Sequence, residues 1–343
     1  CCQACQARLV SCFRLRAIIM LGGLQADSPP GARRSISCVP ESPAYTLFDG
    51  FFTPNLDDVS IILQPFPDRR SSTLMSSTYI HGFSASEQAR LLAQADALAS
   101  VVFGGLDLAD ARTLLEVGCG VGAQTRQLLM RWPHMQIHAI DQSPSHLAAA
   151  AEHLRAARAD GQVRLTRARA ERLPLAAAQF DAALTIWVLE HVPEPAQILA
   201  EMVRVLKPGG RVILTEVDNS TFRFFPHNPL IEDWWAQFNA VQRQSGADPF
   251  IGQQLAALAQ AAELTEICVT PLPIVSSRQT PQRRLALLRY TRDLLLSGAD
   301  SLKRAGRVSE ADEQALLAEF AALEARPEVD FQYLAVRLCA RKP

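Results

Sequence analysis

The chain has 343 residues, 48% of them hydrophobic, and its 34 Lys and Arg side chains nearly balance 35 Asp and Glu. This length can bury one sizeable core. The net charge of −1, with no long basic block, argues against a nucleic-acid-binding surface. One modest basic patch on a predicted helix is interpreted as solvated surface; it contains Arg283, Arg284, Arg289 and Arg292.

Residues 1–74 differ in kind from the rest of the chain. They hold five of the eight cysteines, are rich in Pro and Ser, and show no sustained periodicity. The apolar run 15–24 is too short to span a bilayer. We interpret residues 1–74 as a disordered or non-native leader and Met75 as the initiator. With no clear export signal and no C-x-x-C spacing, we expect a cytoplasmic protein without a membrane span.

The segment Thr113–Thr125 predicts a buried strand, a glycine turn and a helix start. Gly118 and Gly120 let the backbone approach a ligand without an intervening Cβ, and the helix offers unpaired N–H groups to an anion. Glu116 adds a negative charge beside them. This combination suits a ligand that carries both an anionic and a cationic group. The glycine spacing also fits a dinucleotide-binding turn.

Downstream, four further strands and two helices are predicted. Gln136–Asp141 is a strand ending in an acid that suits ribose hydroxyls, which either nucleoside ligand would require. Ser143 and Pro144 then begin a helix as cap and first-turn residue. The remaining elements are strands at 162–166, 180–187 and 211–217, and a helix at 196–206 that ends at Lys207-Pro-Gly-Gly210.

The C-terminal third predicts a helix at 252–262, a helical stretch at 281–324 and two final strands. The strands are 266–270 and 331–339, and we expect the second to be antiparallel at the end of the sheet. An aromatic cluster lies between Phe222 and Phe238.

These ordered motifs resemble the class I S-adenosylmethionine-dependent methyltransferases, nearest to the ubiquinone/menaquinone-biosynthesis and small-molecule type. The resemblance covers Thr113–Val217 and rests on E-x-G-C-G-x-G from Glu116, A-E-x-L-P from Ala170, L-E-H-V-P-x-P from Leu189 and L-K-P-G-G from Leu206. It implies an α/β fold: a Rossmann-like seven-stranded sheet with helices on both faces and helical lid insertions. It also implies S-adenosyl-L-methionine as cofactor.

The resemblance assigns cofactor contacts residue by residue. It implies that Gly118, Cys119 and Gly120 form the turn that binds the methionine part, with Glu116 near its ammonium group. Asp141 would accept hydrogen bonds from the ribose hydroxyls. Gln142, Ala170 and Glu171 would lie beside the adenine, and Trp187 near the sulfonium. Packing alone is the alternative for Trp187. Arg169 departs from the family, which usually has an acid there, because a guanidinium cannot accept from the adenine amino group; Glu171 or a backbone carbonyl would take over.

The helix 79–94 looks like the lid helix of this subgroup, with Ser84 and Glu87 at capping-box spacing. Tyr79 would close over the cofactor, or simply pack. On the acceptor side, Trp234, Trp235 and Phe238 are either a substrate wall or core.

His191 is a candidate general base, with a structural hydrogen bond as the alternative. A catalytic metal at Asp218-Asn219 would need a second acid, for which only Glu190 is available. We therefore predict no metal.

We thus expect residues 75–343 to form one methyltransferase domain: lid helices at 75–110, a cofactor-binding core at 111–218, and acceptor-side helices with the last two strands at 219–343. The expected reaction is in-line methyl transfer to a small-molecule metabolite. A protein or RNA methyltransferase and a non-catalytic cofactor-binding module remain open. The acceptor atom and the oligomeric state stay undetermined.

Overall fold

The computed structural model describes residues 79–276 and 279–343. The chain divides into two units, and all described residues belong to the second, Ile61–Pro343. The predictions for residues 1–74 and Met75 lie outside the described part. Within it, no helix is both long and apolar enough to cross a membrane.

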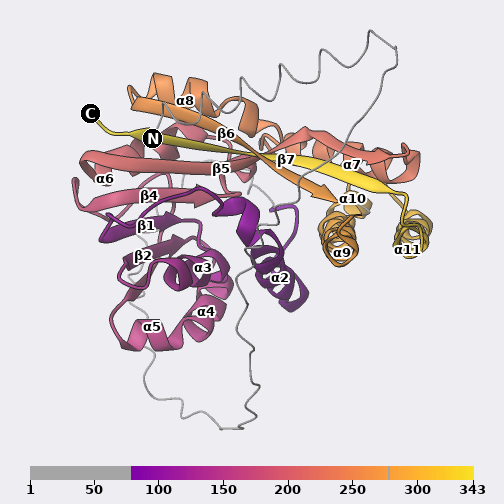
Figure 1. Cartoon of the computed structure of the whole chain (residues 1–343), viewed down its shortest axis with the longest axis horizontal. Helices are drawn as coiled ribbons and strands as arrows, with labels where there is room; N and C mark the ends of the chain where they lie inside the picture. The colour runs from indigo at the N-terminus through magenta and orange to yellow at the C-terminus, as the bar shows by residue number, and fades with distance from the viewer. Residues whose placement is uncertain (1–78, 277–278) are drawn as a thin grey trace, which may run out of the picture. The chain divides into compact units, whose positions relative to one another are not determined.

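The described unit is built on a seven-stranded sheet in the order β3-β2-β1-β4-β5-β7-β6. β1 to β5 run parallel to one another, and β7 is antiparallel to both β5 and β6. The strands are β1 (Thr113–Val117), β2 (Gln136–Asp141), β3 (Val163–Arg167), β4 (Phe180–Ile186), β5 (Leu206–Phe225), β6 (Thr265–Ser276) and β7 (Asp330–Arg341). The predicted α/β fold is therefore confirmed (Figure 1).

The prediction for the last strand is half wrong. β7 is antiparallel as expected, but it lies inside the sheet, and β6 forms the edge. Residues Ala335–Leu338 of β7 are buried on both faces, as an interior strand requires. Pro271 and Pro273 in β6 lack the N–H that an interior strand donates, which fits the place of this strand at the edge.

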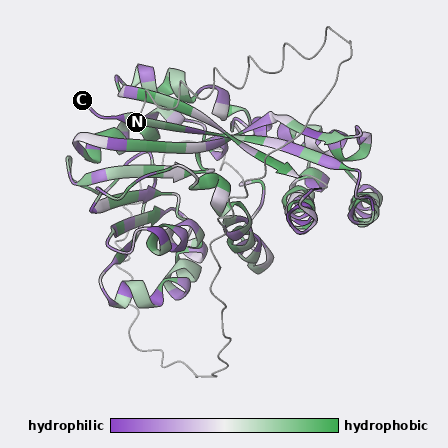
Figure 2. Ribbon diagram, in the orientation of Figure 1, coloured by the Kyte–Doolittle hydropathy of each residue, from purple (hydrophilic) through white to green (hydrophobic). Residues whose placement is uncertain are grey.

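Helices cover both faces of the sheet, and alternate residues of β1 point to the two cores. Leu114 packs in the core that contains Leu128 of α3 (Ala123–Arg131), and Leu115 packs with Ile198 of α6 (Pro195–Val205). Figure 2 shows the apolar residues concentrated in the strands between these layers. The other helices are α2 (Ala85–Val102), α4 (Pro144–His153), α5 (Arg155–Ala159), α7 (Pro229–Gln244), α8 (Leu255–Ala261), α9 (Pro281–Ser297), α10 (Ala299–Arg304) and α11 (Glu310–Glu324).

Strands β5, β6 and β7 extend past the core strands, and α7, α9, α10 and α11 lie along this extension (Figure 1). β5 is much longer than the predicted strand 211–217 because its last residues pair with the beginning of β7. The helical stretch 281–324 is three helices, separated at Gly298 and at 305–309. The predicted helix 252–262 is a short 3₁₀ turn, Ile251–Gln253, followed by α8.

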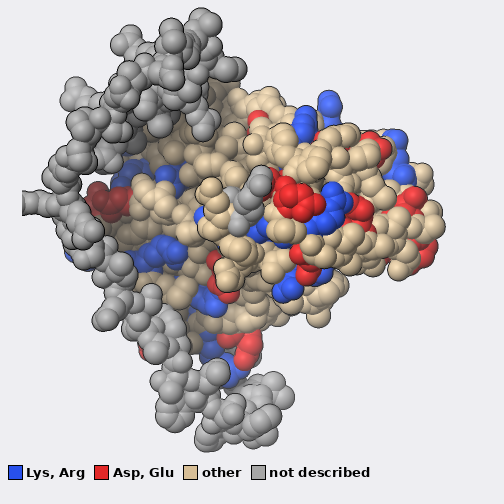
Figure 3. All heavy atoms as spheres, turned by 45° about the vertical axis from the view of Figure 1, so that its right-hand side comes forward, with Lys and Arg blue, Asp and Glu red and all other residues tan. Residues whose placement is uncertain are grey.

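The expectation that the arginine patch is wholly solvated is wrong for Arg284. This side chain is buried and donates to the carbonyls of Leu323, Arg326 and Val329, so it ties the end of α11 to α9. Arg289 lies at the surface and pairs with Glu324. Figure 3 shows acidic and basic side chains interspersed on this side of the molecule.

Candidate functional site

A cavity of about 800 Å³ lies at the carboxyl ends of β1, β2 and β4, with α2, α7 and α9 completing its wall. The strand order reverses beside β1, where β2 and β3 lie on one side and β4 and β5 on the other. In open α/β sheets, ligands bind at this topological switch point. Nine of the ten predicted cofactor residues line the cavity: Tyr79, Gly118, Cys119, Gly120, Asp141, Gln142, Ala170, Glu171 and Trp187.

The glycine turn between β1 and α3 is shaped for close approach. Gly118 has a φ of +75°, and a Cβ there would lie 2.5 Å from Val188 Cγ2. The N-cap of α3, Gly122, supplies no side-chain cap, so the first N–H groups of the helix stay available to an anionic group.

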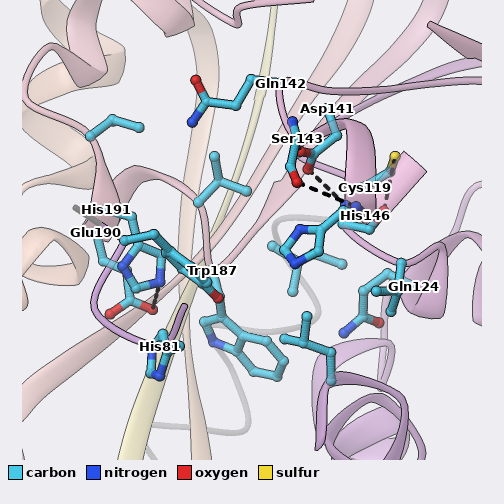
Figure 4. Close-up of a pocket in the computed structure, with 18 of the residues that line it drawn as sticks. His81, Cys119, Gln124, Asp141, Gln142, Ser143, His146, Trp187, Glu190 and His191 are labelled. Atoms are coloured by element: carbon cyan, nitrogen blue, oxygen red, sulfur yellow. Dashed lines mark hydrogen bonds and ion pairs between the residues drawn. The ribbon is translucent and has the colours of Figure 1, made fainter. Parts of the chain in front are cut away.

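Asp141, at the end of β2, fixes the turn from the other side. Its Oδ2 accepts from the Gly120 N–H at 2.9 Å, and its Oδ1 accepts from the Ser143 N–H at 2.8 Å. Ser143 itself caps α4, with Pro144 in the first turn, as predicted. Figure 4 shows Asp141, Ser143 and Cys119 together on one side of the cavity. Each carboxylate oxygen keeps a lone pair for a further donor such as a ribose hydroxyl.

Glu116 lies behind the turn and not in the cavity wall. It is 2% exposed, and its Oε2 accepts from Thr125 Oγ1 at 2.6 Å. Burial raises its pKa to about 8, against the effect of the Thr125 hydrogen bond and with help from Asp141. Burial therefore favours the protonated carboxyl, and a cation nearby would favour the charged form.

Next to Asp141, past the carboxyl ends of β2 and β3, Gln142, Ala170 and Glu171 line the cavity together with Arg169. The Arg169 guanidinium lies 3.0 Å from Glu171 Oε1. Arg169 therefore positions the carboxylate that stands next to it. An acceptor is present at this end although the residue that departs from the family is a donor.

Three buried polar atoms without a partner mark the same cavity. Gln124 Oε1, His146 Nε2 and Trp187 Nε1 are sealed from solvent and form no hydrogen bond within the described residues. Buried polar groups are normally paired, so a ligand that supplies a carboxylate, an ammonium or hydroxyls fits this set. Figure 4 shows these side chains around the cavity, with Trp187 between the side of Asp141 and the side of His191. Trp187 adopts a φ of +55°, a strained conformation for a tryptophan.

Gln124 and His146 were missed by the sequence analysis. His146 is in the first turn of α4 and Gln124 in the first turn of α3. Their one sequence signal is position: both follow a motif strand by a few residues, at a helix start that faces the cavity.

His191 belongs to a hydrogen-bonded group at the opposite end. Its Nδ1 lies 3.3 Å from Gln242 Nε2, and its Nε2 lies 3.6 Å from Glu190 Oε1. Burial lowers the pKa of His191, although Glu190 acts in the opposite direction, so the imidazole is neutral at pH 7. Tyr79 packs edge-on against it, with ring centroids 5.0 Å apart.

The aromatic cluster divides between wall and core. Trp235 and Phe238 line the cavity and stack on each other at 5.2 Å, whereas Trp234 does not line it and donates to Leu295 O. Phe222 stacks behind Trp235 at 4.6 Å and is fully buried. Trp234 thus belongs to the core, and Trp235 and Phe238 lie where a substrate wall would require them.

Helix α2 begins at the predicted cap. Ser84 Oγ accepts from the Glu87 N–H at 3.1 Å, but the Glu87 carboxylate pairs with Arg90 instead of closing the capping box. Tyr79 Oη lies 3.5 Å from Glu87 Oε1.

The Asp218-Asn219 pair is occupied by protein contacts. Asp218 Oδ1 accepts from Ser220 and Gln253, and Asn219 Oδ1 accepts from Tyr333 Oη. In the described parts of the chain, no three His, Cys, Asp or Glu side chains gather as metal ligands would.

Residues 115–214 match the family model described as "Methyltransferase domain". An uncharacterized 37.1 kDa protein in transposon TN4556 of Streptomyces fradiae is 32% identical over 205 residues, which cover 58% of this chain and 57% of that protein. A ubiquinone/menaquinone biosynthesis C-methyltransferase of Syntrophotalea carbinolica is 34% identical over 126 residues, covering 37% of this chain and 50% of the relative. The chain thus spans little more than half the length of these curated relatives.

Among solved structures, a phosphoethanolamine N-methyltransferase of Haemonchus contortus in complex with S-adenosyl-L-methionine is 21% identical with a TM-score of 0.45. The match covers 73% of this chain and 52% of that one.

Proposed function

We propose that the protein, whose residues 115–214 match the methyltransferase domain model, transfers the methyl group of S-adenosylmethionine to a small, partly apolar molecule. The observation that carries the proposal is the continuity of one cavity. It runs from the Gly118 turn and Asp141 to the aromatic rings of Trp235 and Phe238.

The cofactor end supports binding through this chain's own groups. Two backbone N–H donors orient Asp141. Gln124 Oε1, His146 Nε2 and Trp187 Nε1 are buried without a hydrogen-bond partner among the described residues, so polar groups of a ligand could pair with them. Glu116 would become charged when an ammonium group enters above the turn, because a nearby cation lowers the pKa of a buried carboxyl.

The acceptor end supports a small molecule. A volume of about 800 Å³ lies within the range of small-ligand cavities, and its distal wall is mainly aromatic. The cofactor supplies an activated methyl group, so the chain's task is to align the acceptor and exclude water. Alignment alone contributes up to ~7–11 kcal/mol in favourable systems.

Calorimetric titration of the full chain with S-adenosylhomocysteine tests the cofactor part. We expect an affinity in the micromolar range, and its loss in Gly118→Ala, because the added Cβ would meet Val188 at 2.5 Å. Gly209→Ala is the matched control: its φ is +73°, and nothing lies within 4 Å of the added atom. Equal affinity of the two variants, or no binding by the wild type, would refute the site.

A further inference from the structure

His81 lines the aromatic end of the cavity from the segment just before α2. Its Nδ1 lies 2.6 Å from the Oγ of Ser297, the last residue of α9 and 216 positions away in sequence. Figure 4 shows His81 on the same side of the cavity as Glu190 and His191.

Hydrogen-bond accounting fixes the tautomer of His81. The Ser297 hydroxyl has one hydrogen, and its Oγ lies 2.6 Å from the carbonyl oxygen of Leu294, which can only accept. Ser297 must therefore donate to Leu294 and accept from His81. The hydrogen of the neutral ring is consequently on Nδ1, and Nε2 carries a lone pair.

This Nε2 is free to act on a ligand. It has no hydrogen-bond partner among residues 79–276 and 279–343, and it is not one of the unpartnered atoms sealed inside the protein. His191 differs, because its Nδ1 and Nε2 face Gln242 and Glu190. Of the two imidazoles, His81 is the one with an unclaimed acceptor.

The surroundings keep His81 uncharged. Burial, together with the charges of Arg90 on α2 and of His191 when protonated, holds its pKa well below the usual value. Tyr79 and Phe238 pack against the ring at 5.1 and 5.5 Å between centroids and bring no charge at neutral pH. The imidazole is therefore neutral at pH 7, so its Nε2 lone pair is available, although the same burial makes it a weaker base than a free imidazole.

Resting on the proposed function, we propose that His81 is the general base and that the acceptor is an aromatic hydroxyl. The acceptor oxygen forms a bond to the methyl carbon while the sulfur–methyl bond breaks and its electron pair stays on sulfur. The hydroxyl proton moves to His81 Nε2. One positive charge thus passes from the sulfonium to the imidazolium, whose Nδ1–H still donates to Ser297.

The acceptor class follows from the strength of the base and the wall. A weak imidazole base matches a phenol, with a pKa near ~10, far better than an alcohol near that of water at ~16. Trp235 and Phe238 supply ring faces on which an aromatic acceptor stacks.

A matched pair of probes tests this assignment in the full chain: 2-naphthol and 2-naphthalenethiol with S-adenosylmethionine. The two share one ring system, but a thiol ionises more readily than a phenol (~8.5 against ~10 for the side chains of Cys and Tyr) and needs no base. We expect the wild type to methylate both. His81→Phe keeps a ring in place and should lose ~10²–10⁴-fold on the naphthol and less than about threefold on the thiol.

Ser297→Ala and Ser301→Ala separate the tautomer effect from packing. Both serines hold the segment before α2, but Ser301 Oγ donates to Ile80 O and does not touch His81. Ser297→Ala should slow naphthol methylation several-fold more than thiol methylation, and Ser301→Ala should affect both probes equally. His81→Gln is the second base-deficient variant if the phenylalanine disturbs folding.

Equal losses of His81→Phe on both probes, or no loss on the naphthol, would overturn the assignment of His81. Absence of transfer to either probe, with S-adenosylhomocysteine still bound, would overturn the aromatic-hydroxyl acceptor and leave the cofactor proposal standing. Failure to bind S-adenosylhomocysteine would instead refute the proposed function itself.

Discussion

Asp141 has two tasks at the residue scale, because the same carboxylate orders the turn and faces the cavity. Its two oxygens each accept one backbone N–H, from Gly120 and Ser143. A neutral amide in its place has one acceptor oxygen and an NH₂ group that would oppose a backbone donor.

We therefore expect Asp141→Asn to weaken S-adenosylhomocysteine binding ~10–100-fold, corresponding to ~1.5–3 kcal/mol for hydrogen bonds to a charged group. Calorimetric titration at pH 7.5 measures this directly. Asp181→Asn is the comparison, since Asp181 also accepts backbone N–H groups, at 112 and 113, but lies outside the cavity. A weaker effect at Asp141 than at Asp181 would contradict the ribose assignment.

Glu116 gives a pH prediction. Burial raises its folded-state pKa to about 8, above the value of 4.5 for the free group. Its contribution to stability is present below about pH 4.5 and is lost as the pH rises through 8, because the unfolded chain releases the proton first. Urea unfolding should therefore show Glu116→Gln losing less stability than the wild type between pH 5 and 8, by on the order of 1 kcal/mol or more. An unchanged slope would show that Glu116 is ionised in the folded state.

The sequence predicted the residues of the site where a motif carries them and missed those that topology brings in. Asp141 and the glycines follow directly from strand ends that the pattern locates. His81 and Ser297 are 216 positions apart, and no local pattern joins them. Arg284 was misjudged for the same reason: its partners are carbonyls of another helix.

At the scale of elements, helix α2 carries a buried ion pair within its own first turns. Arg90 and Glu87 are 8% and 2% exposed, and Arg90 also donates to Gln94. Tyr79 and His81 precede this helix, so its position sets theirs. The predicted helix boundaries near the motifs agree closely with the structure, whereas the order of β6 and β7 depended on long-range pairing that periodicity does not encode.

Glu87→Ala should cost ~3–5 kcal/mol of folding stability, because it leaves the Arg90 guanidinium buried without its partner. Glu152→Ala is the matched control: it removes an i,i+3 pair with Arg155 whose side chains are 65% and 61% exposed, and such pairs contribute little. Chemical denaturation of both variants gives the comparison. Similar losses in the two would show that burial adds nothing to the contribution of this pair.

At the scale of the whole described unit, one cavity joins residues from both halves of the sheet. The ends of the parallel strands contribute the proposed cofactor end, and β5 and β7 with α7 and α9 contribute the proposed acceptor end. This division explains why the family motifs, which end near Val217, predict a cofactor and leave the acceptor open. On α7, Trp235 and Phe238 face the cavity, whereas Trp234 points into the core and donates to the Leu295 carbonyl.

The central claim, methyl transfer to a small molecule, is tested by following the label. The full chain is incubated with S-adenosylmethionine carrying a tritiated methyl group and with a bacterial extract, which is then separated into small-molecule, protein and nucleic-acid fractions. We predict enzyme-dependent label in the organic-soluble small-molecule fraction and its loss in Gly118→Ala. Label confined to protein or RNA, or equal label with the Gly118→Ala variant, would contradict the account.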